Sequence, residues 1–473
     1  MTVAAGERGH RGRDRLAGGL IVVVWAGVLV QALAGTSAPG PVAVTLVALA
    51  AYLLTQAGCL SRTAWAHLSV GAAVALTTVV LLDDPGPTLV TGLGRAAFLA
   101  ALFAALGTLR EAARASPMVH ETGRMLTQQP PGRRYVAITA GGTLFGAILN
   151  FGAIGLLGGM IQDANTVQAA RGEARIRAIR ERRMMLALLR GFSVLMFWCP
   201  LTVAYAIVGE TLAGAHWTGL MTLGLGMAVI VMAIGWTLDR LTMPRPRAVG
   251  PRAPFRWRRL GPLLGLLLLV FGPAVAVEQL TAGRLIHGVI LVVPVLATAW
   301  LTLARGPAGA ARRLGRYLAT AVPNQRAEIA VLGNAAFMGA AIAGVLPAVG
   351  LHDPFAGLTG LGMPTVLVPA VVPWLVVAAG QAGANPLLTV TVLVALIGDP
   401  AALGVSPTVL GLGLVMGWGL TVGSSPATAA TMMIGRMTDR SAAAVGRGWN
   451  GGHTLVSLTA VSLALAGLHL AWP

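Results

Sequence analysis

The sequence predicts an all-α polytopic membrane protein with about 12–13 transmembrane segments. Two observations indicate this class. Hydrophobic residues make up 56% of the chain and charged residues only 11%, whereas a soluble domain carries about a quarter charged residues. Apolar runs of about 20 residues, long enough to span a bilayer, recur along the chain. We therefore expect the lipid bilayer to surround most of the chain.

The net charge of +18 is explained by where the basic residues lie. All 34 of them are Arg, and they cluster between apolar runs at 8–15, 110–134, 171–190, 240–259, 305–326 and 436–447. Cytoplasmic loops carry an excess of Arg and Lys, so the clusters predict the cytoplasmic side and a cytoplasmic N-terminus. This placement argues against a nucleic-acid partner. The lack of Lys beside abundant Ala, Gly and Arg fits a GC-rich bacterial genome, which predicts the bacterial inner membrane.

Several classes of site find no support in the sequence. Cys59 and Cys199 both lie in apolar segments, which argues against a disulfide framework or a Cys-based zinc site. The histidines show no metal-ligand spacing, and there is no phosphate-binding loop or membrane-protease motif. We therefore expect no enzyme, no metal site, and no cofactor other than a coupling Na⁺.

The predicted segments form six regions along the chain. They are a cytoplasmic tail (1–15), four transmembrane helices (16–108), a first repeat (109–238), a linker with transmembrane helices (239–304), a second repeat (305–435), and a cytoplasmic loop with the last transmembrane helix (436–473). The glycine-rich stretch 135–162 is too short for two crossings, which predicts a re-entrant hairpin. The alternatives are a full span followed by an external basic loop, or an amphipathic surface helix at 163–183.

Two similar proline motifs lie inside long apolar segments, at 191–202 and 417–428. Each has Gly followed by an aromatic residue, Pro nine residues after the Gly, and Thr two residues further on. Pro removes a backbone donor and frees a carbonyl group, which a membrane helix tolerates only where protein or water satisfies that group. Two such breaks in corresponding halves indicate the site of a secondary transporter. Two kinked helices with a chance likeness are the alternative.

A second pair of segments, 134–146 and 326–338, shares Arg, Gly and Phe at constant spacing. In both halves the glycine segment (135–162, then 327–350) precedes the Pro-broken helix (184–209, then 405–435). This order predicts two repeats, and the two broken helices are expected to start on opposite sides, as in inverted repeats. If the basic cluster at 305–326 is cytoplasmic, however, both glycine segments start on the cytoplasmic side, which conflicts with inverted repeats.

Small polar residues gather at these segments and are the predicted binding residues for solute and ion. Half-helix N-termini suit anions, and freed carbonyl groups suit cations. The candidates are Thr143, Asn150, Cys199, Pro200, Thr202, Asn334, Asn385, Ser424, Ser425, Pro426 and Thr428. Ser and Thr also commonly bond to their own helix, which is the alternative role. Asp399, at the end of a predicted span, is the candidate for proton coupling.

This pattern resembles the ion-transporter superfamily of secondary carriers, which includes divalent-anion/sodium symporters, citrate carriers, arsenite pumps and the large membrane subunits of tripartite transporters. The resemblance is architectural and covers roughly 120–440. It implies two inverted repeats, each with a re-entrant hairpin and a broken helix at a central site. Dicarboxylate members carry Ser-Asn-Thr at the hairpin tips. Here the segments read Gly141-Gly142-Thr143 and Gly333-Asn334-Ala335, so only Thr143 and Asn334 keep the residue type.

We therefore expect a secondary transporter that moves a small anionic or neutral solute by alternating access, coupled to Na⁺ or H⁺. The sequence has no cluster of carboxylates at membrane depth, which argues against a metal or organic-cation pump. Expected partners are the solute and the bilayer, with either a homodimer or a periplasmic binding protein. The second hypothesis is a non-transporting polytopic protein, either an assembly or scaffold subunit or an intramembrane enzyme acting on a lipid carrier.

Overall fold

The structure is a computed structural model of the chain, and it describes residues 2–34, 38–168, 172–243, 260–281, 285–351 and 354–471. Within these ranges the chain forms helices and no strand. Nine of the described helices are long and apolar enough to cross a membrane, and three shorter apolar helices accompany them, Gly261–Val277, Leu367–Gln381 and Pro386–Ile397. The predicted all-α, polytopic fold class is confirmed.

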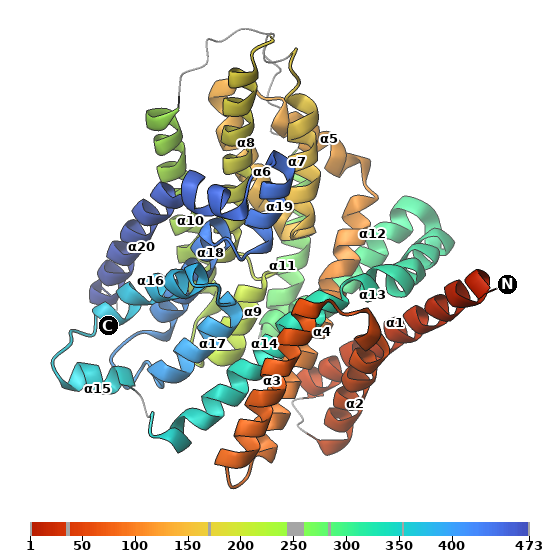
Figure 1. Cartoon of the computed structure of the whole chain (residues 1–473), viewed down its shortest axis with the longest axis vertical. Coiled ribbons are helices and arrows are strands. Elements are labelled where there is room, and N and C mark those ends of the chain that lie inside the picture. Colours follow the sequence, from red (N-terminus) through yellow and green to blue (C-terminus); the bar gives the residue numbers. More distant parts are fainter. Residues whose placement is uncertain are drawn as a thin grey trace. The chain divides into compact units, whose positions relative to one another are not determined.

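The chain divides into two compact units, and Figure 1 labels the helices that belong to them. The first unit contains Met1–Ala115 and Leu268–His352, and the second contains Ser116–Leu267 and Asp353–Pro473. Each unit therefore combines segments that are far apart in the sequence. Both proline motifs, at 191–202 and 417–428, belong to the second unit.

The first unit is built around helix α4, whose second half is almost entirely buried. Its elements are α1 (Thr2–Ala34), α2 (Pro39–Gln56), η1 (Ala57–Cys59), α3 (Arg62–Leu81), α4 (Gly86–Arg114), α12 (Leu285–Arg316), the π-helix η4 (Tyr317–Ala321), α13 (Val322–Asn324), α14 (Arg326–Val345) and η5 (Leu346–Val349). Helix α4 packs against α14, α12 and α1. The four helices predicted over 16–108 are α1 to α4, and α1 also includes the predicted tail.

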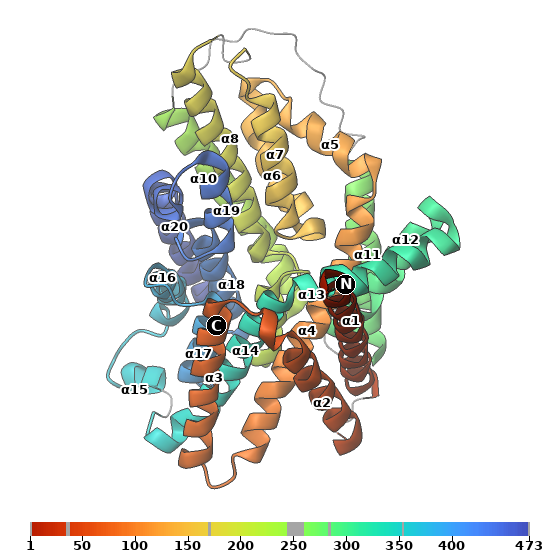
Figure 2. The same ribbon diagram turned by 45° about the vertical axis from the view of Figure 1, so that its right-hand side comes forward.

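The second unit is built around helix α18, in which every residue from Thr408 to Ser424 is buried. Its elements are α5 (Pro117–Thr127), α6 (Pro131–Leu149), α7 (Gly152–Ala164), α8 (Ala174–Val194), η2 (Leu195–Phe197), α9 (Val203–Thr211), α10 (Trp217–Thr242), α15 (Pro354–Gly360), α16 (Leu367–Gln381), α17 (Pro386–Ile397), α18 (Pro407–Ser424), α19 (Ala429–Thr438), η6 (Ala444–Trp449) and α20 (Gly451–Ala471). Helix α11 (Gly261–Thr281) crosses the boundary between the two units in sequence. Helices α16, α20, α8 and α10 pack around α18 (Figure 2).

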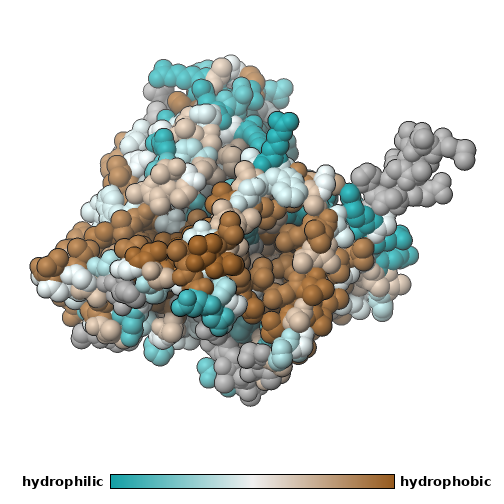
Figure 3. Space-filling model, turned by 60° about the horizontal axis from the view of Figure 1, so that its bottom comes forward, coloured by the Kyte–Doolittle hydropathy of each residue, from teal (hydrophilic) through white to brown (hydrophobic). Residues whose placement is uncertain are grey.

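Many large apolar side chains are exposed in the structure. Val47, Leu54, Leu241 and Leu268 are 69–77% exposed, and brown, hydrophobic surface covers much of the face drawn in Figure 3. Soluble proteins rarely expose contiguous apolar patches of this kind. The exposed apolar surface therefore fits a chain surrounded by lipid.

Elements recur in the same order within the second unit. A helical hairpin (α6–α7), a broken helix (α8–α9) and a long helix (α10) are followed later by a second hairpin (α16–α17), a second broken helix (α18–α19) and a last helix (α20). The motif glycines mark the same contact in both series. A Cβ at Gly191 would overlap the Thr139 carbonyl group of α6, and a Cβ at Gly417 would lie 2.9 Å from Pro373 Cα of α16.

This order differs from the pairing drawn from sequence. The segments 134–146 and 326–338 fall in α6 and α14, and α14 belongs to the first unit. Helix α16 contacts α18 as α6 contacts α8. The counterpart of the 135–162 hairpin is therefore the α16–α17 hairpin, which falls in the stretch that sequence comparison left unpaired. The segment 327–350 is one helix, α14, extended by η5, and it forms no hairpin.

Four predicted basic loops are largely helical. Helix α5 lies within 110–134, α8 begins within 171–190, α12 extends into 305–326, and η6 lies at the end of 436–447. Arg has a high helix propensity. One face of α5 is buried, and apolar side chains of α12 pack against Ala112 of α4. Most of the predicted 240–259 loop lies outside the described residues.

Candidate functional site

The first proline motif breaks its helix as predicted. Helix α8 ends at Val194 and continues as the short 3₁₀-helix η2, and α9 begins only at Val203. Cys199 and Pro200 lie in the gap and are buried. Thr202 starts the next helix: its hydroxyl accepts from the Tyr205 amide at 3.4 Å and donates to the Cys199 carbonyl at 2.9 Å. The two candidate residues Cys199 and Thr202 are thus joined across the break.

The Tyr205 hydroxyl bonds to the backbone at the first break. Its hydroxyl lies 2.7 Å from the Phe197 carbonyl oxygen and 2.9 Å from that of Leu220, so it donates to one of them at a time. The break disrupts the helical bonding around Phe197, and the tyrosine supplies a donor there. A polar side chain of α9 thus satisfies the interrupted backbone.

The second proline motif also breaks its helix as predicted. Helix α18 ends at Ser424 and α19 begins at Ala429. Pro426 has no N–H, so the carbonyl group of Val422, four residues earlier, loses its helical donor. The Thr428 hydroxyl donates to this carbonyl at 2.9 Å. Thr428 therefore replaces the hydrogen bond that Pro426 removes.

Neighbouring side chains bond to further backbone groups at this break. The Ala427 amide, which a continuous helix would direct to Gly423, donates instead to the Ser425 hydroxyl at 3.1 Å. The Gly423 carbonyl accepts from Asn450 Nδ2 at 2.9 Å. The Ser425 hydroxyl donates to the Gly380 carbonyl at the end of α16, at 2.6 Å. The elbow of α18 is thus tied to the second hairpin and to the start of α20.

A polar chain runs outward from Ser424. Its hydroxyl donates back to the Leu420 carbonyl at 2.7 Å and accepts from Gln381 Nε2 at 3.1 Å. The exposed Arg447 in turn donates to the Gln381 side-chain oxygen at 2.9 Å and to its carbonyl at 2.7 Å. The hydroxyl of Ser424 therefore bonds to its own helix, the alternative role considered from sequence, and also connects that helix to α16 and η6.

The two motifs meet at equivalent positions. Ser193 stands two residues after Gly191, and Gly419 stands two residues after Gly417. The Ser193 hydroxyl donates to the Gly419 carbonyl. A Cβ at Gly419 would lie 2.6 Å from the Ser193 carbonyl oxygen, so the close crossing of α8 and α18 requires a glycine there. The two broken helices therefore cross at matching points.

Arg190 is a functional candidate that sequence reasoning missed. It is only 6% exposed, and its guanidinium donates to Asn450 Oδ1 at 2.8 Å, to the Tyr135 hydroxyl at 3.1 Å and to the Gly235 carbonyl at 3.1 Å. These partners are all neutral, and within the described residues Arg190 forms no ion pair. Asn450 connects it to the freed Gly423 carbonyl of the α18 elbow.

The sequence interpretation counted Arg190 with the basic cytoplasmic segment 171–190, and this placement is corrected. Arg190 lies in the buried stretch Met184–Val194 of α8. Its neighbour Arg183, in contrast, pairs with Asp239 at 2.5 Å. The sequence did contain a signal that Arg190 is buried: it lies six residues inside the predicted 184–209 span, directly before Gly191.

Each hairpin carries an asparagine at its turn. Asn150, between α6 and α7, is half-buried and has φ 51° and ψ −135°, a backbone conformation that favours glycine. Asn385 precedes α17, and its side-chain oxygen accepts from the Leu387 amide at 3.0 Å. Thr143 lies in the middle of α6, where its hydroxyl donates to the Gly191 carbonyl. The predicted helical hairpin at 135–162 thus has Asn150, not Thr143, at its turn.

Two candidates lie elsewhere. Asn334 belongs to α14 of the first unit, where its amide donates to the His67 carbonyl at 2.6 Å. Asp399 is exposed, and its carboxylate accepts from the Ala401 amide at 3.0 Å in the loop after α17. Among the described residues no group of three or more His, Cys, Asp or Glu could hold a metal ion. The oxygens at the two breaks are carbonyl and hydroxyl groups.

No protein-family model and no curated protein matches this chain. Among solved structures, the chain is similar to the crystal structure of the Alcanivorax borkumensis YdaH transporter, described as having an unusual topology. The TM-score is 0.54 at 17% sequence identity, and the match covers 87% of this chain and 99% of that one. At this identity the likeness shows a shared fold. The chain thus has the fold of a membrane transporter.

Proposed function

We propose that this protein is a secondary transporter that moves a small anionic solute across the inner membrane by alternating access. The shared fold with a transporter supports the general class. The two helical hairpins and two Pro-broken helices of the second unit support the mechanism, because discontinuous helices form the binding sites of many transporters.

Arg190 carries the assignment of an anionic solute. A buried guanidinium without a carboxylate partner is costly, and ionisable groups at membrane depth normally mark a substrate or ion pathway. Arg190 is held by Asn450, Tyr135 and Gly235, which fix its position and leave its charge uncompensated. Its planar fork suits a carboxylate or phosphate group. The missing negative charge is therefore assigned to the solute.

The repeated order of elements supports inverted repeats in the second unit. Each series contains a hairpin with Asn at its turn (Asn150 and Asn385) followed by a broken helix. The contact between Ser193 and Gly419 joins matching positions, as expected where two repeats cross near a symmetry axis. In this arrangement we expect the hairpins to be re-entrant and to move against the crossing helices.

Na⁺ is the favoured coupling ion. Hydroxyl and carbonyl oxygens gather at Ser425, Pro426 and Thr428, and oxygens of this kind at broken helices coordinate Na⁺ in secondary transporters. The candidate for proton coupling, Asp399, is exposed, and its carboxylate accepts a hydrogen bond from the Ala401 amide within a loop. Proton coupling through Asp399 therefore has less support. A cytoplasmic N-terminus, and a homodimer or a periplasmic binding protein as partner, remain predictions.

The proposal is tested by measuring the thermal unfolding of the purified protein with carboxylates, phosphate, amino acids and neutral sugars, each with and without Na⁺. A ligand that binds only the folded state at 100 times its Kd stabilises it by about 2.7 kcal/mol. We expect at least one anion, and no neutral solute, to raise the unfolding temperature. Uptake of that anion into proteoliposomes then tests transport itself.

Arg190→Gln should remove the anion-dependent stabilisation, and Arg190→Lys should retain part of it because the charge is kept. Arg240→Gln is the matched control, because Arg240 is exposed and lies over the Trp236 ring. Equal stabilisation of Arg190→Gln and the unmodified protein would refute the assigned residue. If neither a solute nor Na⁺ stabilises the unmodified protein, the non-transporting hypothesis replaces the carrier.

A further inference from the structure

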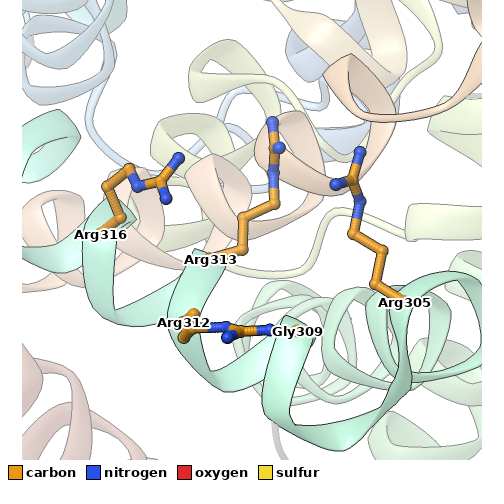
Figure 4. A pocket seen from close by; sticks show the side chains of 5 residues that line it. All are labelled: Arg305, Gly309, Arg312, Arg313 and Arg316. Atoms are coloured by element: carbon orange, nitrogen blue, oxygen red, sulfur yellow. The ribbon is translucent and has the colours of Figure 1, made fainter.

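A second cluster of charge lies in the first unit, at the end of helix α12. Arg305, Gly309, Arg312, Arg313 and Arg316 line a pocket of about 380 Å³. Gly309, Arg312, Arg313 and Arg316 follow the Gly306 kink at helical spacing, and Arg305 lies directly before it. Figure 4 shows the side chains of Arg305, Arg313 and Arg316 extending to the same side of the ribbon. Four cations therefore surround one space.

The backbone explains how this face forms. Gly306 has φ 73°, which breaks α12 into two helical pieces, and Pro307 follows directly. In the second piece Ala310 and Leu314 pack against Ala112 of α4 and Leu301 of the first piece. Arg312 and Arg316 of this short piece are exposed, whereas Arg313 reaches back to Glu111 of α4. Gly309 has no side chain, which keeps the floor of the pocket open.

The positive charge of the pocket is largely uncompensated. Arg313 pairs with Glu111 of α4 at 2.8 Å. Arg305, Arg312 and Arg316 are exposed and form no ion pair with a described residue. Like charges three or four residues apart destabilise a helix. An external anion with several oxygen atoms would stabilise this arrangement.

The position of the pocket favours a lipid over a dissolved anion. The first piece of α12 exposes apolar side chains, with Val295 60% and Leu303 89% exposed. Arg305 follows Leu303 by only two residues, so the charged face begins where the apolar, lipid-facing surface ends. Clusters of Arg at this level bind the headgroups of anionic lipids. Arg also binds phosphate through two parallel hydrogen bonds.

We propose that the pocket around Gly309 binds the phosphate headgroup of an anionic phospholipid. The proposal is independent of the transport function, because it concerns only residues of the first unit.

Lipid binding is measured by titrating phosphatidylglycerol into the delipidated full-length protein, with phosphatidylcholine, inorganic phosphate and glycerol phosphate as separate arms. Native mass spectrometry counts the bound lipids. We expect phosphatidylglycerol to bind and the other three ligands to bind at least tenfold more weakly. The triple variant Arg305→Gln, Arg312→Gln and Arg316→Gln should lose affinity on the order of a hundredfold, because each basic residue near an anionic surface contributes roughly a fivefold factor.

Two controls separate a shaped pocket from general attraction. The triple variant Arg62→Gln, Arg240→Gln and Arg436→Gln removes the same charge from exposed positions elsewhere and should bind like the unmodified protein. Gly309→Leu keeps every charge but fills the floor of the pocket, and it should weaken binding at least tenfold. Full binding by Gly309→Leu, or equal loss in the control triple variant, would overturn the proposal. Equal affinity for free phosphate and for the lipid would overturn it as well.

Discussion

The hydroxyl of Thr428 provides the sharpest test of how the second break is stabilised. Thr428→Val keeps the shape of the side chain and removes its only donor. That hydroxyl has one proton and two carbonyl acceptors, Val422 at 2.9 Å and Ser425 at 3.0 Å. The Ser425 carbonyl also accepts from the Thr431 hydroxyl at 2.7 Å. The proton of Thr428 is therefore needed at Val422.

The expected cost follows from the burial of Val422, which is 5% exposed. Pro426 supplies no N–H, so in the variant the carbonyl of Val422 has neither a helical nor a side-chain donor. Leaving a buried acceptor unsatisfied costs about 1–3 kcal/mol. Thr428 makes no side-chain capping bond to α19, and the loss of its 3.0 Å contact with the Thr431 hydroxyl adds little because that hydroxyl also donates to the Ser425 carbonyl. We expect the free energy of unfolding to fall by that amount.

The free energy of unfolding is measured by reversible denaturation in detergent micelles, with Thr428→Ser as the matched control. Serine keeps the hydroxyl and loses only a methyl group, so it should retain most of the stability. Equal destabilisation by the Ser and Val variants would show that the hydroxyl is not what matters. A change below about 0.5 kcal/mol for Thr428→Val, within the range of ordinary surface substitutions, would refute the reasoning.

Two further substitutions test local backbone geometry by the same unfolding measurement. A Cβ at Gly446 would overlap the Ser424 carbonyl group, so Gly446→Val should destabilise by about 1–3 kcal/mol through overpacking, whereas Gly448→Val, with open space around it, should change little. Asn385→Ala removes the cap of α17 and should cost about 1 kcal/mol, with no loss speaking against the cap. Asn150→Gly should be tolerated because of the positive φ, whereas Asn150→Val should destabilise by at least about 1 kcal/mol.

Local signals predicted much of the fold. Apolar runs of membrane-spanning length correspond to described helices. In lipid, a single segment can satisfy its own backbone N–H and C=O groups only by forming a helix. Pro200 and Pro426 marked the two breaks. A proline lacks the N–H group and so removes one helical hydrogen bond wherever it stands in the chain. Thr202 and Thr428 each begin the helix that follows the break.

The repeat was only partly predictable. The two proline motifs share an outline, and each marks a break in its helix. The 326–338 segment matched 134–146 in residue types, yet α14 lies in the first unit and α16 contacts α18 as α6 contacts α8. The spacing of glycines in the sequence indicates that another helix packs closely there, but it does not identify that helix. Only the contacts of Gly191 and Gly417 identify the partner helices.

By itself, the sequence determined that this chain is an α-helical membrane protein, where two of its helices break, and that the hairpin at 135–162 is rich in glycine. These properties depend on local composition and on the backbone chemistry of Pro and Gly. Tertiary structure decided that Ser193 meets Gly419, that Arg190 is buried among neutral partners, and that four arginines of α12 share one pocket. Each of these depends on which helices pack together, because the charge or hydroxyl of a residue acquires its role only from the groups brought against it.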